Sequence, residues 1–230
     1  MISLEVSSKM TNPFTRLKSY IIENTKIDKQ RIEQWVNEVL EEKDTPEFDE
    51  NVKLYCVENH KPDPTREEDK DEGRVYGTTR TSITYSGTDH SNRKVDKIEV
   101  SFYIDNFMDY YEEMELDYIK FCFETDFFFF KVISFGLFEV KNVPRWVLEF
   151  LYYRMIRKDM KNKIRRTVLH EYRHTEQFLF LAKSKVNIRK VVDDDNSLPY
   201  GKGPLEKDAI RYSEDKIDIP LDQVFVNYME

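Results

Sequence analysis

The sequence is short of the residues that would define several common classes of protein. Among its 230 residues there are only two cysteines, four histidines, six glycines and two alanines. Two cysteines cannot build a disulfide framework or a thiolate metal site. We therefore expect Cys56 and Cys122, which lie in apolar or mixed segments, to be buried free thiols in a reducing compartment. A glycine-rich phosphate loop is also missing, because residues 201–203 lack the strand-to-helix spacing of a P-loop.

Long apolar runs and an excess of positive charge are missing as well. The most apolar segment, residues 127–138, is interrupted by Lys131 and is too short to span a bilayer. Residues 1–9 contain no basic stretch followed by an apolar run, so we expect no secretory signal. The net charge of −8 and the pI near 5.3 argue against a general affinity for nucleic acid or for anionic membranes. We expect a cytoplasmic protein that binds neither; its oligomeric state does not follow from the sequence.

The residues that are abundant describe a globular protein. Hydrophobic residues make up 40% of the chain and charged residues 35%, which is enough for a sizeable core and a well-solvated surface. Lys, Glu, Asp, Phe and Tyr are common while alanine is rare. This bias is typical of AT-rich genomes, among them those of viruses and mobile elements.

The first part of the chain is predicted to be helical and then polar. Apolar residues recur at helical spacing over residues 13–43, in two stretches separated at residues 24–28. Residues 44–73 are polar and proline-containing, which predicts a surface loop or linker. Within this segment, residues 52–57 are a candidate for a short strand.

The middle of the chain is predicted to form strands. Alternating patterns over residues 75–85 and 97–104 predict two strands that are joined by a turn at 86–92. Residues 106–117 are consistent with a short helix. The aromatic segments 118–123 and 127–140 look like a buried hairpin that turns at residues 124–126, and we interpret the aromatic run as sheet core.

Helices are predicted after the strands. Apolar stripes indicate one helix at residues 145–159, a second that begins near residue 161, and a third that opens at Gly203-Pro204. Strands followed by helices indicate an α+β fold, with a small mixed or antiparallel sheet packed on the helix that carries residues 170–174. We predict two domains: an N-terminal helical extension with its polar loop over residues 1–74, and the main domain over residues 75–230.

The most informative part of the sequence is residues 170–174, His-Glu-Tyr-Arg-His. On a helix, His170 and His174 rise from one face about one turn apart, which is the spacing that two imidazoles need to bind one tetrahedral zinc ion. Glu171 lies beside them, where its carboxylate can reach a water on the metal without being a ligand. A catalytic zinc site usually takes three protein ligands, so a third must come from elsewhere in the chain.

Glu206 is the candidate for that third ligand. Gly203-Pro204 is a good helix opening and places Glu206 in the first turn of a new helix. Ala209, one turn further on, is one of only two alanines in the chain. Its small side chain would allow this helix to approach the histidine helix closely enough for Glu206 to reach the metal.

Together, His170-Glu171-x-x-His174 and Glu206-x-x-Ala209 resemble the motif of the gluzincin-type zinc metallopeptidases. They are especially similar to compact peptidases of phages and mobile elements, which show His-Glu-x-Arg-His-x-x-Gln and later Tyr-x-x-x-Pro-x-Glu-x-x-Ala. The resemblance covers residues 165–213. Four further residues match the longer pattern: Arg173, Gln177, Tyr200 and Pro204.

Two departures from the family pattern stand out. The broader peptidase motif prefers uncharged residues at the positions of Arg173 and Glu176. Thermolysin-like members also carry an aspartate four residues after the glutamate ligand, and this chain has none at that position. A different partner for the metal-binding histidines is expected, such as Asp208 or a backbone carbonyl.

The resemblance implies an enzyme that hydrolyses peptide bonds. His170, His174 and Glu206 would bind Zn²⁺, and Glu171 would be the general base for a zinc-activated water whose pKa the metal lowers to about 7. The protein or peptide substrate is expected to lie as an extended strand along an edge of the sheet. Three residues are candidates for stabilising the oxyanion, and the sequence does not rank them: Tyr200, Tyr212 and Arg173.

Other hypotheses stay open. The protein could be a non-catalytic zinc-binding interaction protein of a virus or mobile element, with residues 13–43 and 44–73 as its binding surface. The basic run at 157–166 is more simply the exposed face of helices than a nucleic-acid site. The acidic run 193–195 lacks the alternating oxygens and the glycine of an EF-hand, so we expect a solvated loop there. His60 and His90 lie in polar segments and are expected to be solvated.

Overall fold

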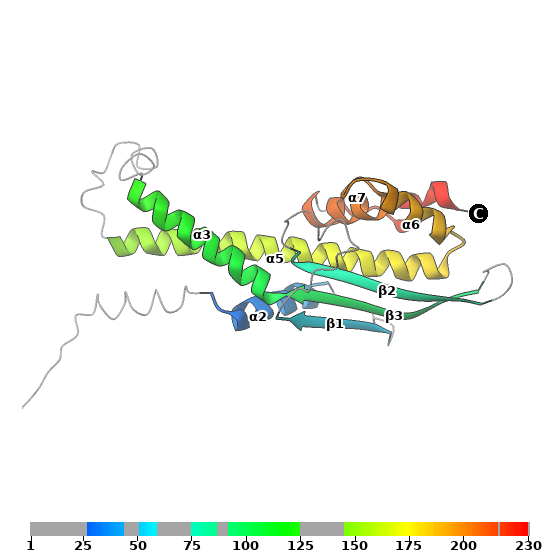
Figure 1. Ribbon diagram of the computed structural model, residues 1–230, viewed down its shortest axis with the longest axis horizontal. Coiled ribbons are helices and arrows are strands. Elements are labelled where there is room, and N and C mark those ends of the chain that lie inside the picture. Colours follow the sequence, from blue (N-terminus) through cyan, green and yellow to red (C-terminus); the bar gives the residue numbers. More distant parts are fainter. Residues whose placement is uncertain are drawn as a thin grey trace, which may run out of the picture. The chain divides into compact units, whose positions relative to one another are not determined.

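The structure, a computed structural model, confirms an α+β fold of helices and one small mixed sheet (Figure 1). It describes residues 27–43, 51–58, 75–86, 92–124, 145–215 and 217–229. Contacts divide the chain into two compact units: Met1–Ile27 with Glu112–Asp159, and Asp28–Tyr111 with Met160–Glu230. The domain boundary at residues 74 and 75 stays a prediction. The sheet and the 170–174 motif both belong to the second unit.

Three strands form the sheet: β1 (Val52–Val57), β2 (Gly77–Ser86) and β3 (Asn92–Tyr103). Their order is β1-β3-β2, with β1 parallel and β2 antiparallel to β3. The predicted strands at 52–57, 75–85 and 97–104 are therefore confirmed. Ile98, Val100 and Phe102 share one face of β3 and are buried there, as the alternating pattern predicts. Their partners on β2 include Gly77 and Thr79, which lie on the same face.

The motif lies on one long helix, α5 (Arg145–Lys183). The prediction of two helices with a break near residue 160 is wrong. The segment contains neither glycine nor proline, and Met160 and Ile164 are fully buried and continue the apolar stripe across the expected break. The length of α5 matters for the site because His170 and His174 lie well inside the helix, where the backbone geometry is regular.

The predicted short helix at 106–117 is confirmed, but it is part of a longer one, α3 (Ile104–Glu124). The first strand of the predicted hairpin, residues 118–123, is therefore wrong. Its aromatic residues suit a helix as well as a strand, and no glycine or proline interrupts residues 104–124. The second predicted strand, residues 127–140, lies outside the described residues.

Helix α2 (Lys29–Glu41) confirms the second helical stretch of the N-terminal region, and the first stretch lies outside the described residues. Asp28 caps the helix by accepting a hydrogen bond from the backbone N–H of Arg31 at 2.8 Å. The apolar stripe of α2 is buried, and the Lys161 amine on α5 lies 5.1 Å from the ring centre of Trp35. Helix α2 therefore packs beside α5.

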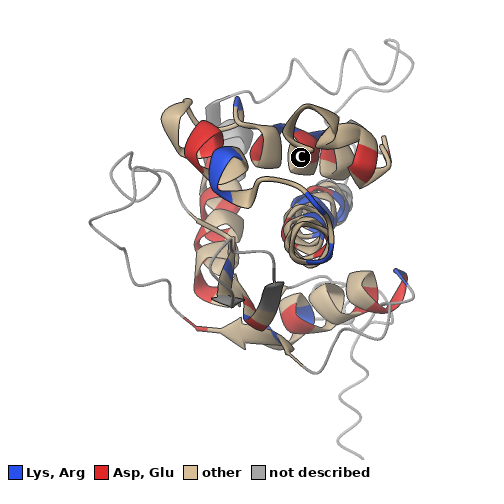
Figure 2. Ribbon diagram, turned by 90° about the vertical axis from the view of Figure 1, so that its right-hand side faces the viewer, with Lys and Arg blue, Asp and Glu red and all other residues tan. Residues whose placement is uncertain are grey.

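The C-terminal part contains α6 (Ile188–Ser197), α7 (Pro204–Ile210), the π-helical turn Arg211–Asp215, α8 (Leu221–Val224) and a final 3-10 turn, Val226–Tyr228. Residues 193–195 are helical, so the predicted loop at this position is wrong. Asn187 caps α6 through the N–H of Lys190, and Val191 anchors the helix in the core. The end view shows the motif part of α5 between the sheet and the layer of α6 and α7 (Figure 2).

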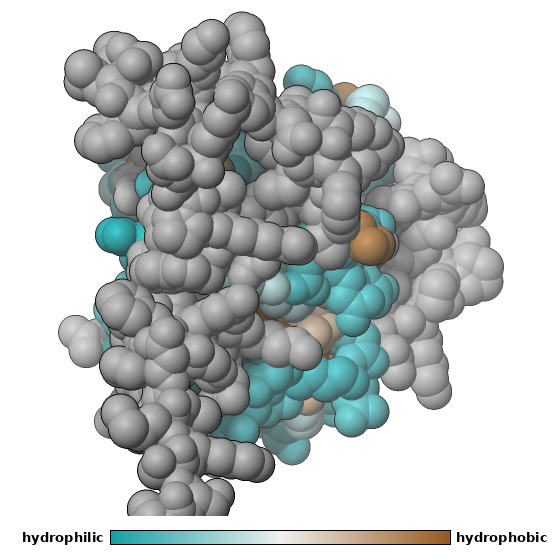
Figure 3. Space-filling view, turned by 90° about the vertical axis from the view of Figure 1, so that its left-hand side faces the viewer, coloured by the Kyte–Doolittle hydropathy of each residue, from teal (hydrophilic) through white to brown (hydrophobic). Residues whose placement is uncertain are grey.

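One face of the described residues is largely polar. On the face shown in Figure 3 the coloured residues are mostly hydrophilic, with small hydrophobic spots. Within the described ranges, no helix is both long and apolar enough to cross a membrane. Cys56 is exposed, which corrects the expectation of a buried thiol; in the described sheet β1 is an edge strand that pairs with β3. The side chain of Cys122 lies outside the described residues.

Candidate metal centre

The two histidines of the motif face each other across one turn of α5. The Nε2 atoms of His170 and His174 are 3.1 Å apart, and the ring planes meet at 87°. The side chain of His174 is 10% exposed and that of His170 is 14% exposed. The expected convergence of two imidazole nitrogens on one face is therefore present, in a largely water-excluded position.

Glu206 on α7 brings a carboxylate to the same point. Its Oε2 lies 3.3 Å from His170 Nε2, and its Oε1 lies 3.2 Å from His174 Nε2. The candidate ligand atoms of the three residues all lie within 4.8 Å of one another. Two stretches that are 32 residues apart in sequence thus meet as the motif spacing predicts.

Helix α7 is placed by a cap that comes from another helix. Its own N-cap residue, Gly203, has no side chain, and Asp195 on α6 accepts hydrogen bonds from the N–H groups of Leu205 at 2.9 Å and Glu206 at 3.4 Å. A Cβ atom at Gly203 would lie only 2.0 Å from Asp195 Oδ1, so a glycine is required here. Ala209 is fully buried, as a close approach of α7 to its neighbours requires.

The charges at this point stabilise one another in the metal-free protein. Burial disfavours the charged form of His174, but the hydrogen bond and the charge of Glu206 outweigh burial and raise the pKa of His174 to about 9. Burial also opposes ionisation of Glu206, yet its contacts with both imidazoles hold the pKa of that carboxyl well below its usual range. The site therefore favours a carboxylate next to positive charge.

The donor set fits zinc. Glu206 Oε2 is buried and lies 3.3 Å from His170 Nε2, yet among the residues that the structure describes it makes no hydrogen bond of good geometry, as expected for an atom that another group can bind. Two imidazole nitrogens and one carboxylate oxygen are ligands that zinc accepts. Three ligands would leave one of the four tetrahedral positions for water or substrate.

Glu171 is held against the sheet by β2. It is 6% exposed, and the hydroxyl of Thr79 donates to its Oε2 at 2.7 Å and to its backbone carbonyl at 3.2 Å. A Cβ atom at Gly77 would lie 2.8 Å from Glu171 Cγ, so β2 and α5 approach closely only because residue 77 is glycine. The sequence analysis did not predict the roles of Thr79 and Gly77. The one available signal was the glycine at the start of a predicted strand, which often marks a close approach of another segment.

Gln177 is the direct hydrogen-bond partner of His174, at 2.8 Å between Oε1 and Nδ1. The predicted partner, Asp208, lies one step further away and accepts from Gln177 Nε2 at 2.8 Å. Arg173 donates from Nε to Asp208 Oδ2 at 2.7 Å and also pairs with Glu176 and Asp218. The Arg173 guanidinium is thus engaged with these carboxylates, and its role in stabilising an oxyanion stays a prediction.

The two candidate tyrosines lie in different surroundings. Tyr200 precedes α7 and is 65% exposed. Tyr212 lies in the π-helical turn, is buried, and its hydroxyl is 2.6 Å from the Lys43 amine. The ring of Tyr212 stacks on Tyr172 with 6.5 Å between centroids. Their roles in stabilising an oxyanion stay predictions.

Comparison of the chain with protein-family models, with curated proteins and with solved structures found no match. The resemblance to gluzincin-type metallopeptidases therefore rests on residues 165–213 alone and stays a prediction. What the geometry adds is independent of that resemblance: His170, His174 and Glu206 converge, and Glu171 lies next to them in the chain.

Proposed function

We propose that this protein is a zinc-dependent metallopeptidase, in which His170, His174 and Glu206 hold the metal and Glu171 is the general base. The observation that carries the proposal is the convergence of the three ligand atoms within 4.8 Å in a largely buried position. When bound, zinc supplies a Lewis acid that polarises a carbonyl and makes water acidic near neutral pH.

The chain's own residues support a proton-transfer role for Glu171. Thr79 donates a hydrogen bond to one carboxylate oxygen, Oε2, and so fixes the orientation of the carboxylate. In this role the Glu171 carboxylate would accept the proton of the attacking water and return it to the leaving amine.

Two further features favour catalysis over a purely structural metal. A structural zinc usually has four protein ligands, whereas the described residues supply a group of three. The strand whose Thr79 bonds Glu171, β2, is also an edge strand of the described sheet. A peptide that pairs with β2 would run past Glu171, which agrees with a substrate bound as an added strand.

The test is Glu171→Gln, with Glu33→Gln on the exposed face of α2 as the matched control. Zinc content is measured by elemental analysis, and hydrolysis is measured with a mixed peptide library read by mass spectrometry. We expect Glu171→Gln to keep about one zinc per chain and to lose hydrolysis by roughly 10²–10⁴-fold, while the control matches the unaltered protein.

Three results would count against the proposal. If the purified protein takes up no transition metal, the metal centre itself is refuted. If Glu171→Gln cleaves at the unaltered rate, the role of Glu171 as general base is refuted. If the protein binds zinc but cleaves no peptide, the peptidase activity is refuted, and a non-catalytic zinc protein that binds a partner is the better explanation.

A further inference from the structure

A buried chain of polar side chains runs from α7 to the back of the His174 ring. Gln177, Asp208 and Arg173 are 0%, 3% and 3% exposed, so water does not compete for their hydrogen bonds. Asp208 lies on the same helix as Glu206, and Gln177 lies on the same helix as the histidines. This series of hydrogen-bonded side chains therefore joins α5 and α7, the two helices that supply the proposed metal ligands.

The orientation of the Gln177 amide follows from its neighbours. One end of the amide lies 3.0 Å from the carbonyl oxygen of Leu205 and 2.8 Å from Asp208 Oδ2. Both of these atoms accept hydrogen bonds, so the end that faces them must be the NH₂ group. The carbonyl Oε1 of Gln177 then has to face His174 Nδ1, at 2.8 Å.

Asp208 is kept as an acceptor by Arg173. The guanidinium donates from Nε at 2.7 Å and from Nη2 at 3.3 Å, which is a two-pronged pairing with both carboxylate oxygens. Arginine stays protonated in proteins, so this end of the chain can only donate. The donor and the acceptor of each hydrogen bond are thus fixed in turn. Arg173 donates to Asp208, Gln177 donates to Asp208, and Gln177 accepts from His174.

We propose that Arg173, Asp208 and Gln177 act as positioning residues that place the proton of His174 on Nδ1 and leave the Nε2 lone pair for the metal. This inference rests on the proposed function, because positioning His174 matters only if the site binds a metal. An isolated neutral imidazole can carry its proton on either nitrogen, and only the Nδ1–H form presents Nε2 to a metal. Partners of this kind typically contribute 10–100-fold to metal affinity.

The experiment compares three variants of the full chain. Gln177→Met is close in shape but cannot accept from Nδ1; Gln177→Glu keeps an acceptor oxygen but meets Asp208 with like charge. Thr175→Val is the control, because Thr175 is equally buried and its hydroxyl donates a hydrogen bond to the backbone carbonyl of Glu171, outside the Arg173-Asp208-Gln177 series. The readouts are ¹⁵N resonances of the His174 ring, zinc affinity by competition, and the melting temperature. The resonances are recorded in zinc-loaded protein and in metal-free protein above pH 9, where the ring is neutral and carries a single proton.

We expect a protected Nδ1–H on His174 in the unaltered protein, in Gln177→Glu and in the control. Gln177→Met should lose that signal and bind zinc 10–100-fold more weakly. Gln177→Glu should melt at a lower temperature yet keep its zinc affinity within a few-fold. Affinity would then follow the acceptor at position 177 and not the stability of the fold.

Failure of this inference and failure of the proposed function give different results. If the protein binds zinc, but Gln177→Met binds it equally well or His174 carries its proton on Nε2, the positioning role is refuted and the metal centre stands. If the protein binds no zinc, the proposed function fails, and the ring resonances of the metal-free protein still decide the proton position. Should Gln177→Met not fold, weak zinc binding by a folded Gln177→Glu refutes the positioning role.

Discussion

Replacing Gly77 by alanine tests whether β2 places the general base. An alanine Cβ would lie 2.8 Å from Glu171 Cγ and 3.0 Å from Thr167 Cγ2. Both are atoms close to the backbone of α5, so they cannot swing aside cheaply. Overpacking of this kind costs about 1–3 kcal/mol. If residue 77 did not lie against Glu171, alanine would instead stabilise the strand by roughly 0.5–1 kcal/mol relative to glycine. The sign of the change in the free energy of unfolding therefore decides whether β2 packs this closely on α5.

Thermal unfolding of Gly77→Ala measures this cost. A loss of 1–3 kcal/mol lowers the melting temperature of a domain of this size by roughly 2–12 °C. In a double-mutant cycle, Glu171→Ala removes the atom at 2.8 Å and should recover much of the loss. Zinc content should stay near one per chain because Gly77 supplies no ligand. A melting temperature that is unchanged or higher in Gly77→Ala would refute the close packing of β2 on the motif.

Three further predictions concern the helix that carries Glu206 and the charge of the site. Asp195→Ala removes the cap of α7, so it should lower the free energy of unfolding by about 0.5–2 kcal/mol and weaken zinc binding. The control Asp193→Ala changes an exposed residue of the same helix and should alter the free energy of unfolding by less than about 0.5 kcal/mol. Equal effects of the two substitutions would contradict the capping role. Ala209→Leu should push α7 away, cost about 1–3 kcal/mol and lower zinc affinity; full affinity would show that the spacing is not critical. The pKa of His174 is raised from 6.5 to about 9, so its contribution of about 3 kcal/mol to the metal-free fold is complete below pH 6.5 and is lost as the pH rises through 9. Zinc should stabilise the protein increasingly over the same range, because neutral imidazoles bind the metal. Urea unfolding with and without zinc at pH 6 and pH 9 measures this. The same stabilisation by zinc at both pH values would contradict the prediction.

Local patterns predicted the metal-ligand candidates because their signals are local. The offset of four between His170 and His174 fixes a shared helix face, and Gly203-Pro204 marks the start of the helix that carries Glu206. The same kind of reasoning found the three strands and α2. These features depend on residues within one or two turns, or on alternation within a single strand.

The remainder depends on contacts between distant segments. Thr79 meets Glu171 across 92 positions, and Asp195 caps a helix to which it does not belong. No short-range pattern reports such contacts. The predicted break in α5 and the hairpin strand at 118–123 failed for a different reason: aromatic and charged residues without glycine or proline suit several local structures, and packing decides between them.

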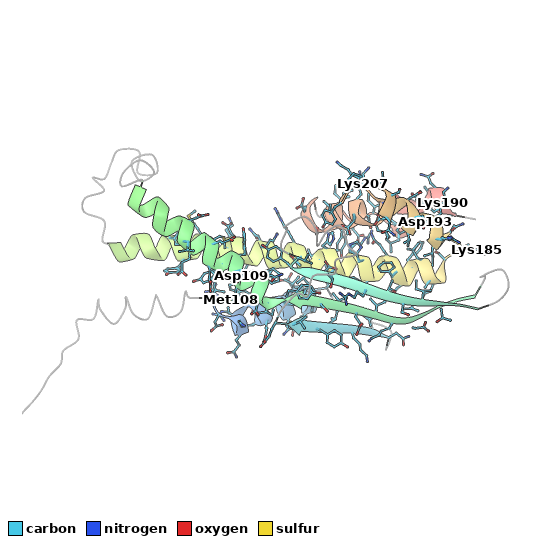
Figure 4. The ribbon with its side chains drawn as sticks, viewed as in Figure 1. Met108, Asp109, Lys185, Lys190, Asp193 and Lys207 are labelled. Atoms are coloured by element: carbon cyan, nitrogen blue, oxygen red, sulfur yellow. The ribbon has the colours of Figure 1, made fainter. Side chains whose placement is uncertain are left out.

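Surface residues set a limit of another kind. Lys207, next to Glu206 in the chain, lies on the outer side of α7 in Figure 4, as do Lys190 and Asp193 on α6. Their charges carry no clear sequence signal because solvent tolerates either sign.

The most direct measurement is anomalous diffraction at the zinc edge from crystals of the protein grown with one equivalent of zinc. The proposed centre predicts a single strong peak about 2.0–2.2 Å from His170 Nε2, His174 Nε2 and a carboxylate oxygen of Glu206. The peak should be lost from crystals of Glu206→Ala prepared in the same way. No peak in zinc-loaded crystals, or a peak that lies away from these three side chains, would contradict the assignment of the metal centre.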